Sequence, residues 1–106
     1  MTNSTHQLLR EFKAGLANIY GLRLKGVYLY GSRARGDQDR ESDLDVLVIL
    51  DDLGHYGEEV DRTSHLVSEL SLKYGVSISR VFVSQQDWLE RQTSFLANVR
   101  EEAIAI

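Results

Sequence analysis

The sequence contains no cysteine. This absence excludes disulfide bonds and thiolate metal sites. No apolar run approaches the length that a membrane-spanning helix needs. Residues 1–13 also lack the basic and then apolar layout of a signal peptide. We therefore expect a cytoplasmic protein that does not associate with membranes.

Positively charged residues are also fewer than negatively charged ones. The chain has 12 lysine and arginine residues against 16 aspartate and glutamate residues, and a net charge of −4. A general nucleic-acid surface is usually basic, so we do not expect general nucleic-acid binding. The length of 106 residues suits a single domain over residues 1–106. Because a domain of this size buries a modest share of its surface, a homodimer or a partner protein would add to its buried area.

Apolar periodicity predicts three helices. The first covers residues 5–20 and is ended by Gly21. The second covers residues 57–74. The third follows an N-cap at Ser84 and continues as one helix through Val99. The sequence shows no repeats and no low-complexity segment that would interrupt this order.

Three further runs predict β-strands, at residues 26–31, 43–52 and 76–83. Side chains alternate between the two faces of a strand, so Asp43 and Asp45 share a face. Both faces of the second strand are apolar after Asp45, which indicates a central strand whose acidic end lies at an edge of the core. The order α-β-β-α-β-α predicts an α/β (α+β) fold, a short mixed sheet with helices packed on it.

The acidic pair lies in the stretch YLYGSRARGDQDRESDLDVLVIL, which runs from Tyr28 to Leu50. Burying a carboxylate without a partner is costly, so Asp43 and Asp45 need either solvent or a cation. Two carboxylates on one side of a strand suit joint ligation of Mg²⁺. This ion takes a few carboxylates and completes its coordination with water and phosphate oxygens.

Gly31 and Ser32 follow the first strand in the same stretch. A glycine lets the backbone approach a phosphate closely, and exposed N–H groups and the Ser32 hydroxyl would act as donors. Arg33, Arg35 and Arg40 would neutralise phosphate charge nearby. Together with a metal site, these residues indicate phosphoryl or nucleotidyl transfer. Taken singly, the same elements have simpler interpretations: a solvated strand end, an ordinary turn and a solvated charged loop.

The combination of Gly-Ser, a short interval and Asp-x-Asp on a strand resembles the signature of the nucleotidyltransferase superfamily that includes DNA polymerase beta. The longer form GSRARGDQDRESDLDVLV looks like the minimal nucleotidyltransferases of the MNT type. This resemblance implies the nucleotidyltransferase fold. It also implies that Gly31 and Ser32, with Arg33 and Arg35 nearby, bind the phosphates of ATP or another NTP.

The same resemblance implies that Asp43 and Asp45 are the catalytic residues and hold Mg²⁺, in a one-ion or a two-ion site. The family pattern asks for a third carboxylate on the next strand, and this sequence departs from it. The matching position is Ser77, with Ser79 as the alternative on the same face. Three interpretations stay open: weak catalysis with retained nucleotide binding, an acid supplied by a partner, or a slow reaction for which two carboxylates suffice.

The leading hypothesis is transfer of a nucleoside monophosphate, AMP from ATP, to an acceptor. Minimal family members in prokaryotes typically act as antitoxins, which neutralise a HEPN-type ribonuclease toxin by binding it or by attaching AMP to a tyrosine. The resemblance therefore implies a HEPN-type toxin as partner. One alternative is a catalytically degenerate module that neutralises its partner by binding alone. Another is transfer to a small molecule, which would need further walls around the acceptor.

Three other features have interpretations that do not involve catalysis. Tyr28 and Tyr30 share a face of the first strand, and core packing is favoured over a role as a wall of the nucleotide site. Glu101 and Glu102 near a helix C-terminus are typical of a solvated face. The apolar residues 103–106 either fold back onto the domain or meet a partner, and the small size of the domain favours the partner.

Overall fold

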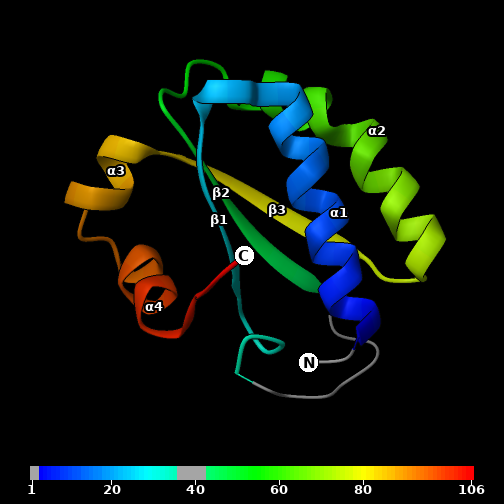
Figure 1. Cartoon of the computed structure of the whole chain (residues 1–106). Coiled ribbons are helices and arrows are strands. Elements are labelled where there is room, and N and C mark those ends of the chain that lie inside the picture. The colour runs from blue at the N-terminus through cyan, green and yellow to red at the C-terminus, as the bar shows by residue number, and fades with distance from the viewer. Residues whose placement is uncertain (1–2, 36–42) are drawn as a thin grey trace.

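The computed structural model describes residues 3–35 and 43–106 and has three layers, a central sheet with helices on both faces (Figure 1). In chain order the elements are α1 (Asn3–Tyr20), η1 (Gly21–Arg23), β1 (Leu24–Tyr30), β2 (Leu44–Leu50), α2 (Tyr56–Tyr74), β3 (Ile78–Ser84), α3 (Gln85–Glu90), α4 (Ser94–Glu102) and β4 (Ile104–Ala105). Within these two ranges, no helix combines the length and the apolar character that crossing a membrane requires.

The four strands form one sheet in the order β3-β2-β1-β4. β2 runs antiparallel to β1 and parallel to β3, so the sheet is mixed. Its position between these two neighbours confirms the prediction of a central strand. The mixed sheet with helices packed on it is the fold that the sequence predicts.

The two faces of β2 contribute to two separate apolar clusters. One face packs beneath α1 and α2, and its buried side chains are Leu44, Val46, Val48 and Leu50, joined by Leu8, Phe12 and Leu16 of α1 and Leu70 of α2. The other face packs beneath α3 and α4, and its buried side chains Leu47 and Ile49 meet Val99, with Trp88 at the margin. Strand alternation therefore assigns each face of β2 to one helical layer, as the sequence pattern predicts.

The prediction of one helix after Ser84 is wrong, because two short helices occupy this segment. Ser84 does cap α3, accepting a hydrogen bond at 3.1 Å from the backbone N–H of Asp87. A second cap at Thr93, which accepts from the backbone N–H of Leu96 at 3.2 Å, starts α4. A threonine side chain that satisfies a free N–H stabilises a new helix start, and this contact replaces continuation of the first helix.

The C-terminal residues fold back onto the domain as strand β4, the less favoured of the two alternatives from the sequence. Ile104 pairs with Leu29 and Ala105 with Tyr28 in the antiparallel sense. The N–H of Ile106 donates to the carbonyl of Val27 at 3.0 Å. β4 thereby covers part of β1, which would otherwise present a row of unpaired backbone groups at the sheet edge.

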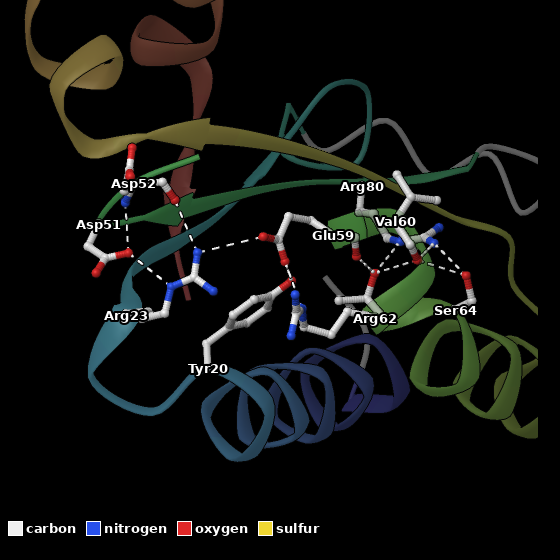
Figure 2. A network of polar contacts seen from close by, with 10 residues as sticks. Tyr20, Arg23, Asp51, Asp52, Glu59, Val60, Arg62, Ser64 and Arg80 are labelled. Atoms are coloured by element: carbon white, nitrogen blue, oxygen red, sulfur yellow. Dashed lines mark hydrogen bonds and ion pairs between the residues drawn. The ribbon is translucent and has the colours of Figure 1, made fainter. Parts of the chain in front are cut away.

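A buried polar network holds α1, α2 and the end of β2 together (Figure 2). Glu59 of α2 is only 3% exposed. Its carboxylate accepts hydrogen bonds from the Tyr20 hydroxyl at 2.9 Å and from Arg62 Nε at 3.0 Å, and lies 3.6 Å from Arg23 Nη2. The carboxylate thus has a donor for each side of the group, which offsets the cost of its burial.

Candidate functional site

The site begins with the tight turn that ends β1. Gly31 has a φ of +79°, in the left-handed region that favours glycine. The carbonyl of Gly31 accepts hydrogen bonds from the N–H groups of Ala34 at 3.1 Å and Arg35 at 3.2 Å, which closes the turn. Because Tyr30 is paired with Asp45, the turn lies directly beside the acidic start of β2.

Gly31 is also in close contact with one of the two predicted metal ligands. A Cβ atom built at Gly31 would lie 2.4 Å from Asp45 Oδ2 and 3.3 Å from its Cγ. Both distances are closer than van der Waals contact between non-bonded atoms. The absence of a side chain at Gly31 therefore permits both the backbone conformation of the turn and the position of the Asp45 carboxylate.

Asp43 and Asp45 lie at the start of β2 with Asp43 exposed and Asp45 partly buried. Among the residues 3–35 and 43–106, neither carboxylate makes a hydrogen bond or an ion pair. Burial raises the pKa of Asp45, the charges of Asp43 and Glu102 raise it further, and the charge of Arg35 lowers it. The two carboxylates thus concentrate negative charge at a position that is partly shielded from solvent, an arrangement typical of cation-binding sites.

The two carboxylates fit Mg²⁺ as oxygen ligands that leave most of the coordination sphere to water and phosphate. No cluster of three or more acidic or histidine side chains with metal-binding geometry occurs in the described part of the chain. The protein's share of such a site would therefore come from Asp43 and Asp45.

The neighbouring strand β3 supplies no acid to this site. Ser79 is the register partner of Asp45, and the carbonyl of Ser77 accepts a hydrogen bond from Leu44 N at 2.9 Å. Both serines therefore lie next to the acidic pair, Ser77 one step outside β3 and Ser79 within it. In parallel pairing, residues in register point to the same face, so Ser79 shares the face of Asp45.

The turn separates the two arginines that were predicted to bind phosphate. Arg35 Nη1 donates to Glu102 Oε2 at 2.7 Å, on the α4 side of the sheet. Arg33 lines a small cavity with Leu8, Leu44 and other residues of the α1–α2 side. The structure therefore places Arg35 where its charge acts on Asp45 and Arg33 on the α1–α2 side, while Ser32 lies half-buried in the turn just before Arg33. Arg40 lies outside the described residues.

Glu102, the last residue of α4, is a member of the site that the sequence did not predict. Its Oε1 accepts from Gly31 N at 3.2 Å and its Oε2 accepts from Arg35. The hydrogen bond from Arg35 lowers the pKa of Glu102, burial opposes this effect, and the Gly31 N–H lowers the pKa further. One sequence signal was available: a glutamate in the last turn of a helix faces the negative end of the helix dipole and so needs a partner elsewhere.

Aromatic side chains cover the sheet beside the acidic pair. The ring of Tyr30 meets that of Phe95 of α4 edge-on, with centroids 5.7 Å apart. The ring of Tyr28 packs against that of Trp88 of α3, with centroids 5.1 Å apart. Burial raises the pKa of Tyr30 to about 12, with the Asp45 charge as a smaller cause. Phe95 is nevertheless 44% exposed, so the packing leaves an aromatic surface open next to the site.

Comparisons with known proteins agree with this geometry. Residues 9–103 match the model of a family described as "Nucleotidyltransferase domain". A protein of Methanocaldococcus jannaschii, provisionally named as a protein adenylyltransferase, is 32% identical over 94% of this chain and 96% of its own length.

Two solved structures share the fold. One is a crystal structure of a toxin–antitoxin with AMP-PNP, with a TM-score of 0.62 and 20% identity over 98% of this chain and 72% of that chain. The other contains a tri-AMPylated HEPN toxin of Shewanella oneidensis in complex with an MNT antitoxin, with a TM-score of 0.50 and 14% identity over 92% and 70% of the two chains.

Proposed function

We propose that this chain, which belongs to the nucleotidyltransferase domain family, transfers AMP from ATP to a hydroxyl group of a partner protein. The observation that carries the proposal is the acidic pair at the start of β2. Asp43 and Asp45 have no partner among the described residues and lie beside the glycine turn. Two carboxylates at the edge of a core, left without a cation of the protein's own, are suited to an external cation with its nucleotide.

The reaction is a displacement at the α-phosphorus. The acceptor oxygen forms a bond to the α-phosphorus, the bond from that phosphorus to the bridging oxygen breaks, and pyrophosphate leaves. The proton of the hydroxyl passes to solvent or to a base. Asp43 and Asp45 would hold Mg²⁺, which when bound neutralises charge on the phosphates. The chain's own contribution is to position the phosphates at the turn of Gly31 and Ser32, where backbone N–H groups act as donors.

The general base is the point at which this chain departs from the family pattern, because Ser77 and Ser79 stand where the family expects a third carboxylate. A serine hydroxyl is neutral and a poor proton acceptor. We propose that transfer proceeds with two carboxylates and that the acceptor's own neighbours assist in deprotonation. This arrangement predicts a slow reaction suited to modifying a partner rather than to rapid turnover.

We propose a HEPN-type toxin as the partner that carries the acceptor hydroxyl. A relative that spans nearly the whole chain is provisionally named a protein adenylyltransferase. A fold neighbour was crystallised as an MNT antitoxin with an AMPylated HEPN toxin. Both support a protein acceptor over a small molecule.

A second candidate is a binding module that neutralises the same partner without chemistry. The serines beside the acidic pair favour it, since they remove the family's third acid. The two candidates differ in what the acidic pair is for. Under the binding hypothesis, Asp43→Ala leaves neutralisation of the partner intact, whereas under the transfer hypothesis this substitution abolishes it.

The experiment is a labelling assay in lysate of the native host with Mg²⁺ and ATP that carries label at either the α- or the γ-phosphate. It compares the wild-type chain with Asp43→Ala and with Asp61→Ala. Asp61 is an exposed residue of α2 and provides a control with the same loss of charge. We expect the α-label alone to reach a discrete protein, with the wild type and the Asp61 variant but not with the Asp43 variant.

Transfer of the γ-label would contradict nucleotidyl transfer and indicate a kinase reaction. If nucleotide binds in the presence of Mg²⁺ but no label is transferred, the binding module is the better description. The next variant to make would then be Ser79→Asp or Ser77→Asp, to test whether an acid at either position brings transfer.

A further inference from the structure

We propose that Glu102 competes with the nucleotide phosphate, so that the end of α4 must release the glycine turn before ATP can bind. This inference rests on the proposed function, because it assigns regulation to the same site. It is carried by two contacts. The carboxylate of Glu102 occupies the Gly31 N–H at 3.2 Å and the Arg35 guanidinium at 2.7 Å.

These donors are the kind that an anionic phosphate would use. A backbone N–H in a tight turn and a guanidinium both bind phosphate oxygens, and both bind carboxylate oxygens in the same way. Glu102 engages them with its two different oxygens. A phosphate oxygen bonded to Gly31 N or Arg35 would therefore have to displace the carboxylate.

The fold holds Glu102 at this position from both sides. α4 ends at Glu102, and β4 follows after Ala103. β4 is fixed to β1 by the pairing of Tyr28 with Ala105 and Leu29 with Ile104. Continued in the same antiparallel sense, this pairing brings Glu102 alongside Gly31. The contact is thus a product of strand addition and not of a chance side-chain orientation.

The contact can be released because it is only partly buried. The Arg35 side chain is 52% exposed and that of Glu102 is 24% exposed, and ion pairs of this kind contribute little to stability. An arriving phosphate would add a further negative charge beside Glu102 and so favour its departure.

The test compares the Kd of the wild-type chain, Glu102→Gln and Glu101→Gln for ATP with Mg²⁺ and for adenosine, measured by titration calorimetry. Glu101 precedes Glu102, is exposed, and makes no hydrogen bond or ion pair with the described turn residues 31–35. The two variants therefore lose the same charge, and a melting curve for each variant confirms that it is folded. We expect Glu102→Gln to lower the Kd for ATP by about five- to twentyfold, as loss of a charged competitor for two donors implies.

Two controls make the result specific. Glu101→Gln should change the Kd for ATP by less than about twofold, because the side chain of Glu101 is exposed to solvent, which weakens the effect of its charge, and does not occupy either donor. Adenosine has no phosphate, so its Kd should be the same for the wild type and Glu102→Gln. Equal ATP affinity in the wild type and Glu102→Gln, equal tightening by Glu101→Gln, or equal tightening for adenosine would each overturn the competition.

The transfer assay, run on the same variants, separates this inference from the proposed function. Tighter ATP binding by Glu102→Gln without transfer by any variant supports the competition and overturns transfer. Transfer of AMP by the wild type, together with an ATP Kd that Glu102→Gln leaves unchanged, supports the proposed function and overturns the competition. No binding of ATP to any variant overturns both.

Discussion

The two ends of strand β2 both carry acidic residues, yet the protein treats them in opposite ways. At the C-terminal end of β2, Asp51 accepts a hydrogen bond from Arg23 Nε at 3.2 Å. The nearby buried carboxylate of Glu59 accepts from the Tyr20 hydroxyl and forms ion pairs with Arg23 and Arg62 (Figure 2). At the N-terminal end, Asp43 and Asp45 have no such partner among the described residues, and the guanidinium of Arg35, whose charge acts on Asp45, is engaged by Glu102.

We interpret this difference as one between acids that serve packing and acids that are available to a ligand. A carboxylate whose donors come from the chain itself contributes to the packing of the elements that supply them. A carboxylate left unpaired at a partly buried position costs stability, and that cost is typical of sites that bind a ligand. Residue type does not distinguish the two groups, since Asp51 at one end of the apolar strand and Asp43 and Asp45 at the other are all aspartates.

The largest expected effect is on transfer. Asp45→Asn should reduce AMP transfer by about a thousandfold, because loss of one carboxylate removes several kcal/mol of charge stabilisation from the transition state. Asp51→Asn, at the other end of the same strand, should leave transfer within about twofold. The rate of α-label incorporation into the acceptor measures both. A comparable loss in the two variants would break the distinction between the two ends.

The glycine turn gives the next largest effect. Gly31→Ala introduces a Cβ against Asp45 Oδ2, and we expect transfer to fall by about a hundredfold, as displacement of a catalytic group implies. Gly21→Ala is the matched control, since Gly21 also has a positive φ of 57° but has no atom within 4 Å of the added Cβ. Both variants should lose about 1 kcal/mol of stability in chemical denaturation. Retained transfer in Gly31→Ala would show that the Asp45 position is not critical.

Beside the C-terminal end of β2, where Glu59 is buried, the expected effect is on stability alone. Glu59→Leu leaves the Tyr20 hydroxyl without its acceptor and two arginines without their shared carboxylate, so the free energy of unfolding should fall by about 2 kcal/mol. Glu58→Leu, an exposed neighbour in the same turn of α2, should change it by less than about 0.5 kcal/mol. Urea denaturation measures both. Similar losses in the two variants would mean that the buried network is not a stabilising feature.

The smallest effect is a difference in pH dependence. Burial raises the pKa of Asp45, so its ionised form costs stability above that raised pKa and the cost disappears as pH falls. Asp45→Asn should therefore raise the melting temperature at pH 7, with a gain in the free energy of unfolding of less than about 1 kcal/mol. This gain should shrink as the pH is lowered.

Asp51 should show the opposite sign. Burial acts to raise the pKa of Asp51, but the hydrogen bonds from Arg23 and from the Asp52 N–H outweigh it and lower the pKa. Its contribution to stability is present above its ordinary pKa and is lost as pH falls, so Asp51→Asn should lower the melting temperature at pH 7 and not at low pH. Melting curves across this range test both variants, and the same sign in both would contradict the comparison.

Much of this arrangement follows from local sequence pattern. The alternation of Asp43, Asp45 and the apolar residues after them is a period of two, which any strand must present on alternate faces. The apolar spacing that predicts α1 and α2 is likewise local. The turn at Gly31 was also predictable, because few residues other than glycine adopt its backbone conformation.

The break between α3 and α4 is also local, but it reflects a cap that competes with helix continuation, a balance that periodicity does not report. Other parts depend on segments that are far apart in the chain. The divergence of Arg33 and Arg35 depends on what lies on each side of the sheet. The role of Glu102 depends on β4 pairing with β1, and the contact with Gly31 joins residues 71 positions apart.

Local sequence is enough to specify the elements, the central strand and the pair of acids on one of its faces, because each follows from the geometry of a few consecutive residues. Which acids find a partner depends instead on how the elements pack together. A charge is satisfied by whatever packing brings next to it. Glu59 and Glu102 receive their partners from other elements, whereas Asp43 and Asp45 receive none from the part of the chain that the structure describes.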